Sequence, residues 1–551
     1  MIMNKINPLI RKILKNRGIT DEDEILEFLS DKPKKTYDPF LLKNMEAGVD
    51  LLLSAIKQNR RICIYGDYDA DGVTSVSLLI QVLSHLTTNL FYYIPSRFVE
   101  GYGLNKDAID LIKRDGAELI ITVDCGSVSY EEVEYGKSIG IDFIITDHHN
   151  INDRPADCIL INPKQSDCSY PFKHLAGCGV AFKLAQGIQR KMGLPKTILS
   201  EVLDLVAIGT IGDIVPLIDE NRTLTKYGMR KINGRKRPGL KRLIEEAGIT
   251  SEEINSEKIA YIIVPHLNAA GRLKDAKTGV ELLISKDKKA IDQNTAILVQ
   301  NNAERKRIQE EAFEACKKIV ETELREDLFY IITPKNIHEG IAGIVAGKIK
   351  DEFGKPTIIL TESGQQGYLK GTGRSIDGVN LYESLKKYES FFLKFGGHSG
   401  ACGFMMKSEY LDELKRCLNH DIEVLYKENS CLFNTDIPID LTVEVGDIDL
   451  DFILNIKKLA PFGCQNEKPL LQITGLKPTY INYMGDNKQH VRFFSQDKSG
   501  KGIYCVFFQR AQDYGEILQK SNELLNVSGY ADINAWNGDS KIQFVIKSIT
   551  C

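Results

Sequence analysis

The sequence predicts an α/β protein with a doubly wound parallel-sheet domain, a smaller second α/β domain and a C-terminal β-barrel. Three observations support this prediction. Short β-branched runs alternate with helical patterns between about residues 60 and 217, and a similar alternation returns between about 328 and 425. After about residue 430 the pattern changes to short alternating strands. Strand–helix alternation is typical of parallel sheets, whereas closely spaced strands are typical of sandwiches and barrels.

The chain has 551 residues, which is too long for a single hydrophobic core. We expect a long amphipathic helix from about Asn294 to Leu324, because this stretch is charged on most of its faces. Asn537-Gly538 is a strong hairpin signal near the C-terminus. The predicted units are an N-terminal helical segment, a catalytic α/β domain, a helical region with the connecting helix, a second α/β domain and a β-domain, at residues 1–45, 46–217, 218–325, 326–428 and 429–551.

The composition is that of an ordinary globular protein, with 43% hydrophobic and 26% charged residues. We expect no signal peptide, because charges interrupt every apolar run at the start of the chain. We expect no membrane span either, because no stretch approaches the roughly 20 apolar residues that a span needs. The 12 cysteines form no C-x-x-C pair, which favours free thiols in a reducing cytoplasm. The run Arg230–Arg242 holds basic but no acidic residues, and it is either a solvated face or a nucleic-acid surface.

Acidic residues are concentrated in "IYGDYDADGVTS", residues 64–75, where Asp67, Asp69 and Asp71 occupy alternate positions after an apolar run. Alternate residues of an extended segment point to the same side, so these carboxylates leave the strand together. In open α/β sheets, ligands bind at this edge. An EF-hand is excluded because its twelfth position is Leu78 instead of Glu, and because a strand precedes the loop.

Three further apolar runs end in candidate ligands, which are Asp124, then Asp147, His148 and His149, and finally Asp213. We expect all of them at one edge of one sheet. A single Asp after a strand is ordinarily a cap or turn residue, but four such sites with adjacent histidines favour bound cations. Oxygen-rich sites with an imidazole suit manganese, magnesium or iron, and two such ions form the usual clamp for attack on a phosphate ester. The predicted chemistry is therefore phosphoester hydrolysis.

These motifs resemble the DHH phosphoesterase superfamily, which is named for the triplet at 147–149. Its branch of bacterial single-stranded-DNA exonucleases is similar over nearly the whole chain, through "YGDYDADG", "VDCG", "DHH", "GTIGDIVPL", "SRFVEGYGL", "HLNAAGRL", "HEGIAGIVAGKI", "GTGRSIDG" and "FGGHSGACG". The resemblance implies DHH, DHHA1 and OB-like domains. It also implies 5′-to-3′ hydrolysis of single-stranded DNA to mononucleotides with two Mn²⁺ or Mg²⁺ ions, in DNA repair and recombination.

The resemblance also implies roles for individual residues. The implied metal ligands are Asp67, Asp69, Asp71, Asp124, His148 and Asp213. Asp124 is expected to bridge the ions, Asp147 to orient a neighbouring histidine, and His149 to act near the scissile phosphate as an orienting group or proton donor. Asp124, His148 and His149 are thus the expected catalytic residues. The implied substrate-binding residues are Arg97, Arg272, Lys348, Arg374 and His398. Lys348 stands where the family usually carries arginine, which reduces any phosphate contact there to a point charge.

Two alternatives remain open. A DHH phosphodiesterase could act on short oligonucleotides or cyclic dinucleotides, although such relatives generally lack a C-terminal β-domain. A non-catalytic single-strand clamp would be expected to show eroded metal motifs, whereas all of them are intact here. The resemblance further implies a cytoplasmic monomer that works on single-stranded DNA with a single-strand-binding protein and a helicase, and without a membrane.

Overall fold

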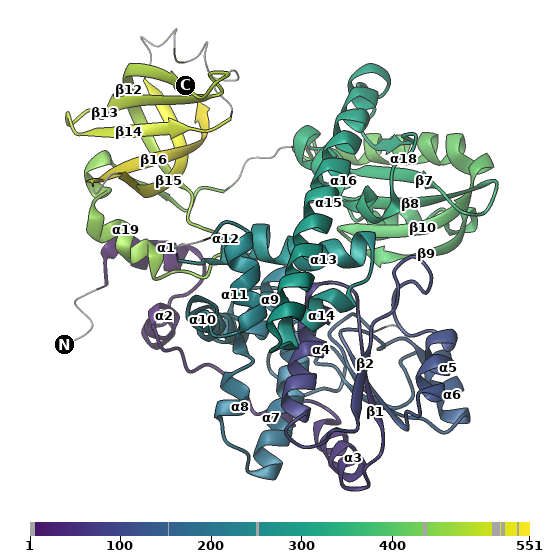
Figure 1. Ribbon diagram of the computed structural model, residues 1–551. Helices are drawn as coiled ribbons and strands as arrows, with labels where there is room; N and C mark the ends of the chain where they lie inside the picture. The colour runs from purple at the N-terminus through teal and green to yellow at the C-terminus, as the bar shows by residue number, and fades with distance from the viewer. Residues whose placement is uncertain are drawn as a thin grey trace.

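The computed structural model describes residues 6–151, 154–249, 253–433, 438–509, 518, 524–536 and 539–550. The predicted fold class is confirmed: two α/β domains and a β-barrel are joined by a helical region. In Figure 1 the barrel (yellow) and the second α/β domain (green) stand on either side of that region. The hairpin predicted at Asn537-Gly538 lies outside the described residues.

The first domain contains a fully parallel sheet in the order β2-β1-β3-β4-β5. Its strands are β1 (Ile62–Gly66), β2 (Leu90–Tyr93), β3 (Leu119–Val123), β4 (Asp142–Thr146) and β5 (Ile159–Ile161). β1 and β3 are buried throughout, as their continuous apolar runs predict. The chain leaves β1 toward β2 on one side and returns to β3 on the other, so the direction of winding switches between β1 and β3.

Helices cover both faces of this sheet. One face packs against the helices α3 (Met45–Lys57), α4 (Ala70–Leu83) and α7 (Gly177–Met192). The other face packs against α5 (Lys106–Arg114) and α6 (Tyr130–Ser138). The sheet is therefore doubly wound, with its interior shielded from water on both sides.

The helical region follows α8 (Thr197–Ser200) and corrects one expectation. The apolar run before Asp213 is a buried helix, α9 (Leu203–Gly212), and not a strand. A helix that is buried on all sides lacks a polar stripe, so the periodicity of its sequence does not distinguish it from a buried strand. The region continues with α10 (Asp219–Asn233), α11 (Pro238–Glu246), α12 (Ser256–Lys258), the π-helix η3 (Ile259–Ile263), α13 (Val264–Leu273), α14 (Lys277–Ile284) and the long α15 (Lys288–Glu323).

Much of the basic run Arg230–Arg242 joins helices to one another. Arg237 is nearly buried and forms two hydrogen bonds of 2.7 and 2.8 Å with the carboxylate of Asp204 at the start of α9. Arg242 pairs with Asp292 on α15 at 2.8 Å. These contacts are structural, so the run does not form a continuous free basic surface.

The second α/β domain has a mixed sheet in the order β6-β7-β8-β10-β9. Its elements are β6 (Tyr330–Ile332), α16 (Glu339–Phe353), β7 (Thr357–Glu362), β8 (Tyr368–Arg374), α17 (Leu381–Lys386), β9 (Phe392–His398), β10 (Ala401–Lys407) and α18 (Leu411–Glu428). The glycine-rich segment near its end forms the antiparallel pair β9–β10. Several of the predicted substrate-binding motifs lie in this domain. "HEGIAGIVAGKI" spans the start of α16, and "FGGHSGACG" spans the turn between β9 and β10.

The C-terminal unit begins with β11 (Leu441–Thr442) and α19 (Leu450–Lys457). Its main strands are β12 (Leu471–Met484), β13 (His490–Gln496), β14 (Gly502–Phe507), β15 (Leu525–Trp536) and β16 (Asp539–Thr550). The order β12-β13-β14-β16-β15, with β15 paired back to β12, closes the sheet into a barrel. Closure leaves no free sheet edge among these strands.

The two ends of the chain share one hydrophobic core. Ile10, Ile13 and Leu14 of α1 (Pro8–Asn16) and Ile25 of α2 (Glu22–Leu29) pack with Phe452 of α19 and with barrel residues. Arg17 pairs with Asp440 at 2.7 Å. Figure 1 shows α1 beside α19, below the barrel. The N-terminal segment is thus packed onto the C-terminal unit.

Candidate active site

The predicted acids converge at the carboxyl edge of the first sheet. Asp67 and Asp69 follow β1, Asp124 follows β3, and Asp147 to His149 follow β4. Asp213 arrives from the C-terminal end of α9. Because winding switches between β1 and β3, a crevice for ligands is expected between those two strands.

Backbone amides hold two of the carboxylates in place. Asp69 caps α4 by accepting hydrogen bonds from the N–H groups of Asp71 (2.9 Å) and Gly72 (3.1 Å). Asp71 accepts from the N–H groups of Gly177 (2.6 Å) and Cys178 (2.9 Å) at the start of α7. A helix N-terminus stabilises negative charge, so α7 offsets part of the cost of burying Asp71.

A side chain at position 177 would collide with the site, because a Cβ there would lie 2.6 Å from Asp124. Glycine at this position therefore allows α7 to approach both Asp71 and Asp124. The close packing of the helix against the acids is what fixes their positions.

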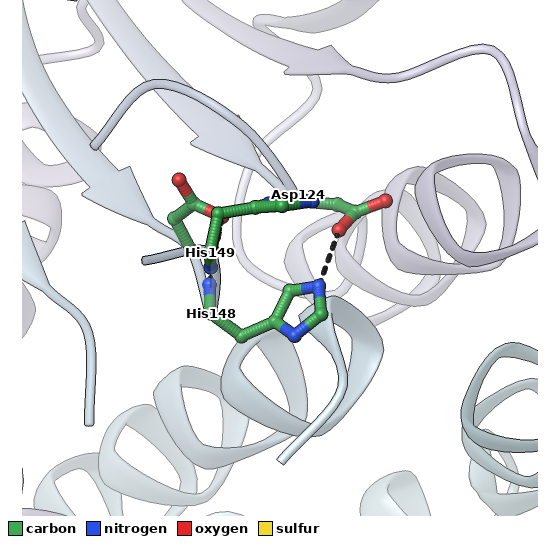
Figure 2. A group of neighbouring side chains, drawn as sticks. Asp124, His148 and His149 are labelled. Atoms are coloured by element: carbon green, nitrogen blue, oxygen red, sulfur yellow. Dashed lines mark hydrogen bonds and ion pairs between the residues drawn. The ribbon is translucent and has the colours of Figure 1, made fainter. Parts of the chain in front are cut away.

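His148 lies among the acidic groups, and Figure 2 shows its contact with Asp124. Its Nε2 lies 3.1 Å from Asp124 Oδ1, 3.4 Å from Asp213 Oδ2 and 4.0 Å from Asp71 Oδ2. Burial, followed by the nearby His149, lowers the pKa of His148 to about 3, so its ring is neutral at pH 7. The ring also has a hydrogen bond with the backbone of Leu175. Since Nε2 has no such bond, Nδ1 donates it, and the Nε2 lone pair is left facing the acids.

The donor atoms fit divalent cations. Among the described residues, Asp67 Oδ1, Asp124 Oδ1 and His148 Nε2 are buried and have no hydrogen-bond partner. Three sets of side chains bring their ligand atoms within 4.8 Å of one another: Asp67, Asp69 and Asp124; Asp71, His148 and Asp213; and Asp124, Asp147, His148 and His149. Unpartnered buried acceptors are costly unless a cation binds them, and carboxylates with one imidazole are the ligands that manganese and magnesium accept.

The pKa values of the carboxylates reflect the same crowding. Burial, followed by neighbouring carboxylates, raises the pKa of Asp67, Asp124 and Asp213 well above the usual range and that of Asp71 to about 6. Compared with the unfolded chain, the folded protein without a cation therefore stabilises the protonated form of these four acids. A bound cation would reverse this preference by neutralising the ionised form.

Asp147 lies near Asp124, but its carboxylate is engaged by protein groups. It accepts hydrogen bonds from the N–H groups of Ser127 (2.9 Å) and His148 (2.7 Å) and from Nδ1 of His149 (2.8 Å). Burial alone would raise the pKa of Asp147, but the His149 hydrogen bond and charge lower it overall. The same contact outweighs burial at His149 and raises its pKa to about 9. Asp147 therefore orients His149, as the sequence leads us to expect.

Three of the predicted substrate-binding residues form an arginine cluster, which we define as Arg97, Arg272 and Arg374. Burial, followed by repulsion from Arg97, lowers the pKa of Arg272 to about 10 and lowers that of Arg374. His398 also lies within their field, since burial and then the Arg374 charge lower its pKa. Arg97 stacks on Tyr68, beside the acidic motif, with its guanidinium 5.2 Å from the ring centre. Like charges that are partly buried together favour an anionic ligand.

Lys348 is engaged elsewhere. Its ammonium pairs with Glu310 on α15 at 2.8 Å and lies 4.3 Å from the ring centre of Phe313. Lys348 thus joins α16 to α15, and its ammonium already has a carboxylate partner.

Two residues of the site were not identified from the sequence. Asn268 accepts a hydrogen bond of 2.6 Å from Ala70 N–H and so ties α13 to the acidic motif. The Tyr102 hydroxyl lies 3.2 Å from Nδ1 of His149. Both stand inside motifs that the resemblance highlights, "HLNAAGRL" and "SRFVEGYGL". The motifs could have pointed to these two residues as part of the site, but the contacts of their side chains are known only from the fold.

Comparison with known proteins defines the class. The family model "DHH family, N-terminal domain" matches residues 61–210, "DHHA1 domain" matches 326–423, and "RecJ OB domain" matches 439–548. A DHH domain with a clustered acid and histidine site and a following DHHA1 domain is the architecture of a metal-dependent phosphodiesterase.

Similarity to individual proteins extends over the whole chain. The chain is 37% identical to the single-stranded-DNA-specific exonuclease RecJ of Bacillus subtilis, over 98% of this chain and 68% of that protein. It is 36% identical to the Escherichia coli RecJ, over 74% and 73%. The crystal structure of Thermus thermophilus RecJ in complex with Mn²⁺ matches with a TM-score of 0.81 at 26% identity, over 99% of this chain and 76% of that chain. The chain therefore belongs to the RecJ family.

Proposed function

We propose that this protein degrades single-stranded DNA from its 5′ end and releases mononucleotides. It is a single-stranded-DNA-specific exonuclease of the RecJ family and a metal-dependent phosphodiester hydrolase. One observation carries the assignment: acids and a histidine from separate elements meet with buried acceptor atoms that lack partners among the described residues. The 5′-to-3′ direction rests on the family resemblance.

The proposed metal ligands are Asp67, Asp69, Asp71, Asp124, His148 and Asp213. Asp124 belongs to a set with Asp67 and Asp69 and to a set with His148, which supports a bridging role between two sites. Two Mn²⁺ or Mg²⁺ ions bound there would lower the pKa of a bound water and offset charge on the attacked phosphate. Asp71 is held by the α7 amides, and these fix the ligand geometry before substrate binds.

His149 has a positioning or proton-transfer role in the proposal. Asp147 fixes its ring through Nδ1, and Tyr102 lies against it at the mouth of the site. From this position the imidazole can orient a phosphate oxygen or supply a proton to the leaving oxygen. Asp147 acts only through His149 and is a positioning residue.

The arginine cluster and His398 supply the phosphate grip. Arg272 and Arg374 each donate to one backbone carbonyl, Gly340 at 3.1 Å and Gly373 at 2.8 Å, which leaves further N–H groups for phosphate oxygens. The barrel would hold the trailing strand, since barrels of this type bind single strands by charge and stacking. Within this proposal, the chain is divided at 1–45, 46–217, 218–325, 326–428 and 429–551, and segment 1–45 works together with the C-terminal unit onto which it packs.

The cellular setting is a further part of the proposal. Among the described residues, no helix is long and apolar enough to cross a membrane. The free cysteines of the described residues support a reducing compartment such as the cytoplasm. A monomeric state and a role in repair and recombination are proposed on the family resemblance. A single-strand-binding protein and a helicase are the proposed partners, on the resemblance alone.

An assay with end-labelled DNA tests the proposal. Single and double strands labelled at either end are incubated with Mn²⁺, Mg²⁺ or a chelator. We expect mononucleotide release from the 5′ end of single strands with either metal, and none with the chelator. A dinucleotide serves as the comparison substrate, because a phosphodiesterase for short oligonucleotides would prefer it to the long strand. Preference for the dinucleotide, or equal degradation of duplex, would overturn the assignment.

A further inference from the structure

The residue after Asp213 has an unfavourable backbone conformation. Ile214 has φ +59°, in the left-handed region that β-branched residues avoid because Cβ crowds the backbone. Its side chain is 73% exposed. The isoleucine therefore contributes little to the core and is poorly suited to the turn, where glycine or asparagine would be better tolerated. Strain of this kind persists only where the surrounding structure enforces it, and it clusters at active sites and ligand-binding sites.

Ile214 lines a cavity of about 1270 Å³. Tyr261, 78% exposed and carried by the π-helix η3, lines the same cavity, as do Arg272 and Arg305. Local π-helices are frequent at functional sites. Exposed apolar side chains beside arginines match a nucleotide, which presents apolar base faces and an anionic phosphate.

The cavity also lies between the segment that flanks Asp213 and the barrel. Phe508, Tyr530 and Lys547 of the C-terminal unit are part of its lining, together with Gly212 and Ile214, the two neighbours of Asp213 in the chain. A released mononucleotide needs no path of this length, whereas the strand that remains after cleavage does. The cavity therefore suits the retained part of the polymer.

We propose that Ile214 contacts the substrate, packing against the base of the nucleotide on the retained side of the scissile phosphate. The inference rests on the proposed function. Asp213 would hold a metal at that phosphate, and Ile214, the next residue along the chain, lines the cavity in which the adjoining base would lie. Tyr261 continues the same apolar wall toward the barrel. The contact involves a base face, which every base has, and a base stacked in a duplex has both faces covered. Ile214 thus contributes to selectivity for single strands without reading sequence.

Three variants test this contact. Ile214→Gly and Ile214→Asn remove the apolar side chain and suit the left-handed backbone, whereas Ile214→Leu keeps an apolar side chain. On a 5′-labelled single strand, we expect kcat/KM for the first cleavage to fall about tenfold in the Gly and Asn variants and about twofold or less in the Leu variant. The melting temperatures of the Gly and Asn variants should equal or exceed that of the unsubstituted protein, since the strain is relieved.

A strand with an abasic second nucleotide makes the test specific. That substrate lacks the base that Ile214 would touch, so the unsubstituted protein and the Gly variant should cleave it at equal rates. Equal cleavage of the intact strand by these two proteins would overturn the inference, and so would a tenfold deficit that persists on the abasic strand. Failure of the proposed function has a different signature, because the unsubstituted protein would then leave the intact strand uncut.

Discussion

The acidic edge of the first sheet and the arginine cluster have side chains of opposite charge, and in both regions burial and neighbouring like charges disfavour the charged form. At the acidic edge, burial and then neighbouring carboxylates raise the pKa of Asp124 and Asp213. In the arginine cluster, burial and then Arg97 lower the pKa of Arg272 and Arg374. Each region is therefore destabilised in its charged form until a ligand of opposite charge arrives. In the proposed function, cations fill this role at the acidic edge and phosphate does so at the cluster.

The two regions differ in how firmly their side chains are held. Asp71 uses both carboxylate oxygens to accept from the α7 amides, and Asp69 caps α4. Arg374 has one donated hydrogen bond, to the carbonyl of Gly373. Short side chains fixed by backbone amides are preorganised, whereas long side chains with free donors can adapt to a ligand. We infer that the acids set the chemistry and that the arginines follow the moving strand.

The strongest way to break this comparison is Asp124→Asn, which keeps the shape of the side chain but removes its charge. If Asp124 bridges two ions, cleavage should fall by about 1000-fold or more, because both ions lose a ligand. Strand binding, measured by fluorescence anisotropy, should change little, since the arginine cluster is intact. Manganese-dependent cleavage at a near-normal rate would contradict the division of labour.

A pH series separates the acidic edge from the rest of the molecule. The folded pKa of Asp71 is about 6 and thus lies above the ordinary value of 3.8, so the folded state binds more protons than the unfolded state between these pH values. Its contribution to stability is complete below the unfolded pKa and is lost as the pH rises through about 6. A shift of this size corresponds to about 3 kcal/mol of unfolding free energy.

The measurement is thermal unfolding of chelated protein from pH 4 to pH 7, repeated with Mn²⁺. Without metal, the melting temperature should fall across this range, with further loss at higher pH from the other raised carboxylates. With Mn²⁺ the fall should be reduced, because the cation binds the ionised form. Asp71→Asn should give a shallower slope without metal. Identical curves with and without Mn²⁺ would argue against a cation at the acidic edge.

The arginine cluster is tested by Arg374→Gln, which keeps a polar side chain and removes the charge. We expect KM for a single strand to rise about tenfold or more, with a smaller change in kcat, since charge-assisted contacts to phosphate contribute mainly to binding. Arg307→Gln is the matched control, because Arg307 is exposed on α15 and pairs with Glu304 and Glu311. An equal effect of both substitutions would show that general charge, and not the cluster, sets the affinity.

The sequence predicts most of the acidic edge because each of these acids directly follows an apolar run that can be recognised in the sequence. Asp67, Asp124 and Asp147 directly follow parallel strands, and the carboxyl ends of such strands share one edge. Asp213 was expected there for the wrong reason, since the apolar run before it is the buried helix α9. Composition alone does not separate a buried strand from a helix buried on all sides.

The contacts of long side chains and of distant segments could not be predicted in this way. Ile10 and Leu14 pack with Phe452, more than 400 residues away, and no local pattern identifies that partner. Similarly, the motif around Lys348 indicates a basic residue but not the direction of its ammonium. Positions that depend on tertiary packing therefore need the structure.

The smallest expected effect concerns Lys348→Ala. Its ammonium pairs with exposed Glu310 and lies over Phe313, so the substitution removes an exposed ion pair and some packing, worth about 1 kcal/mol or less in stability. KM for a single strand should change by about twofold or less, well below the Arg374→Gln effect. Glu310→Gln, which breaks the same pair from the other side, should match it in melting temperature. A tenfold rise in KM for Lys348→Ala alone would mean that Lys348 leaves Glu310 when the strand binds, and that the phosphate grip extends along α16 beyond the arginine cluster.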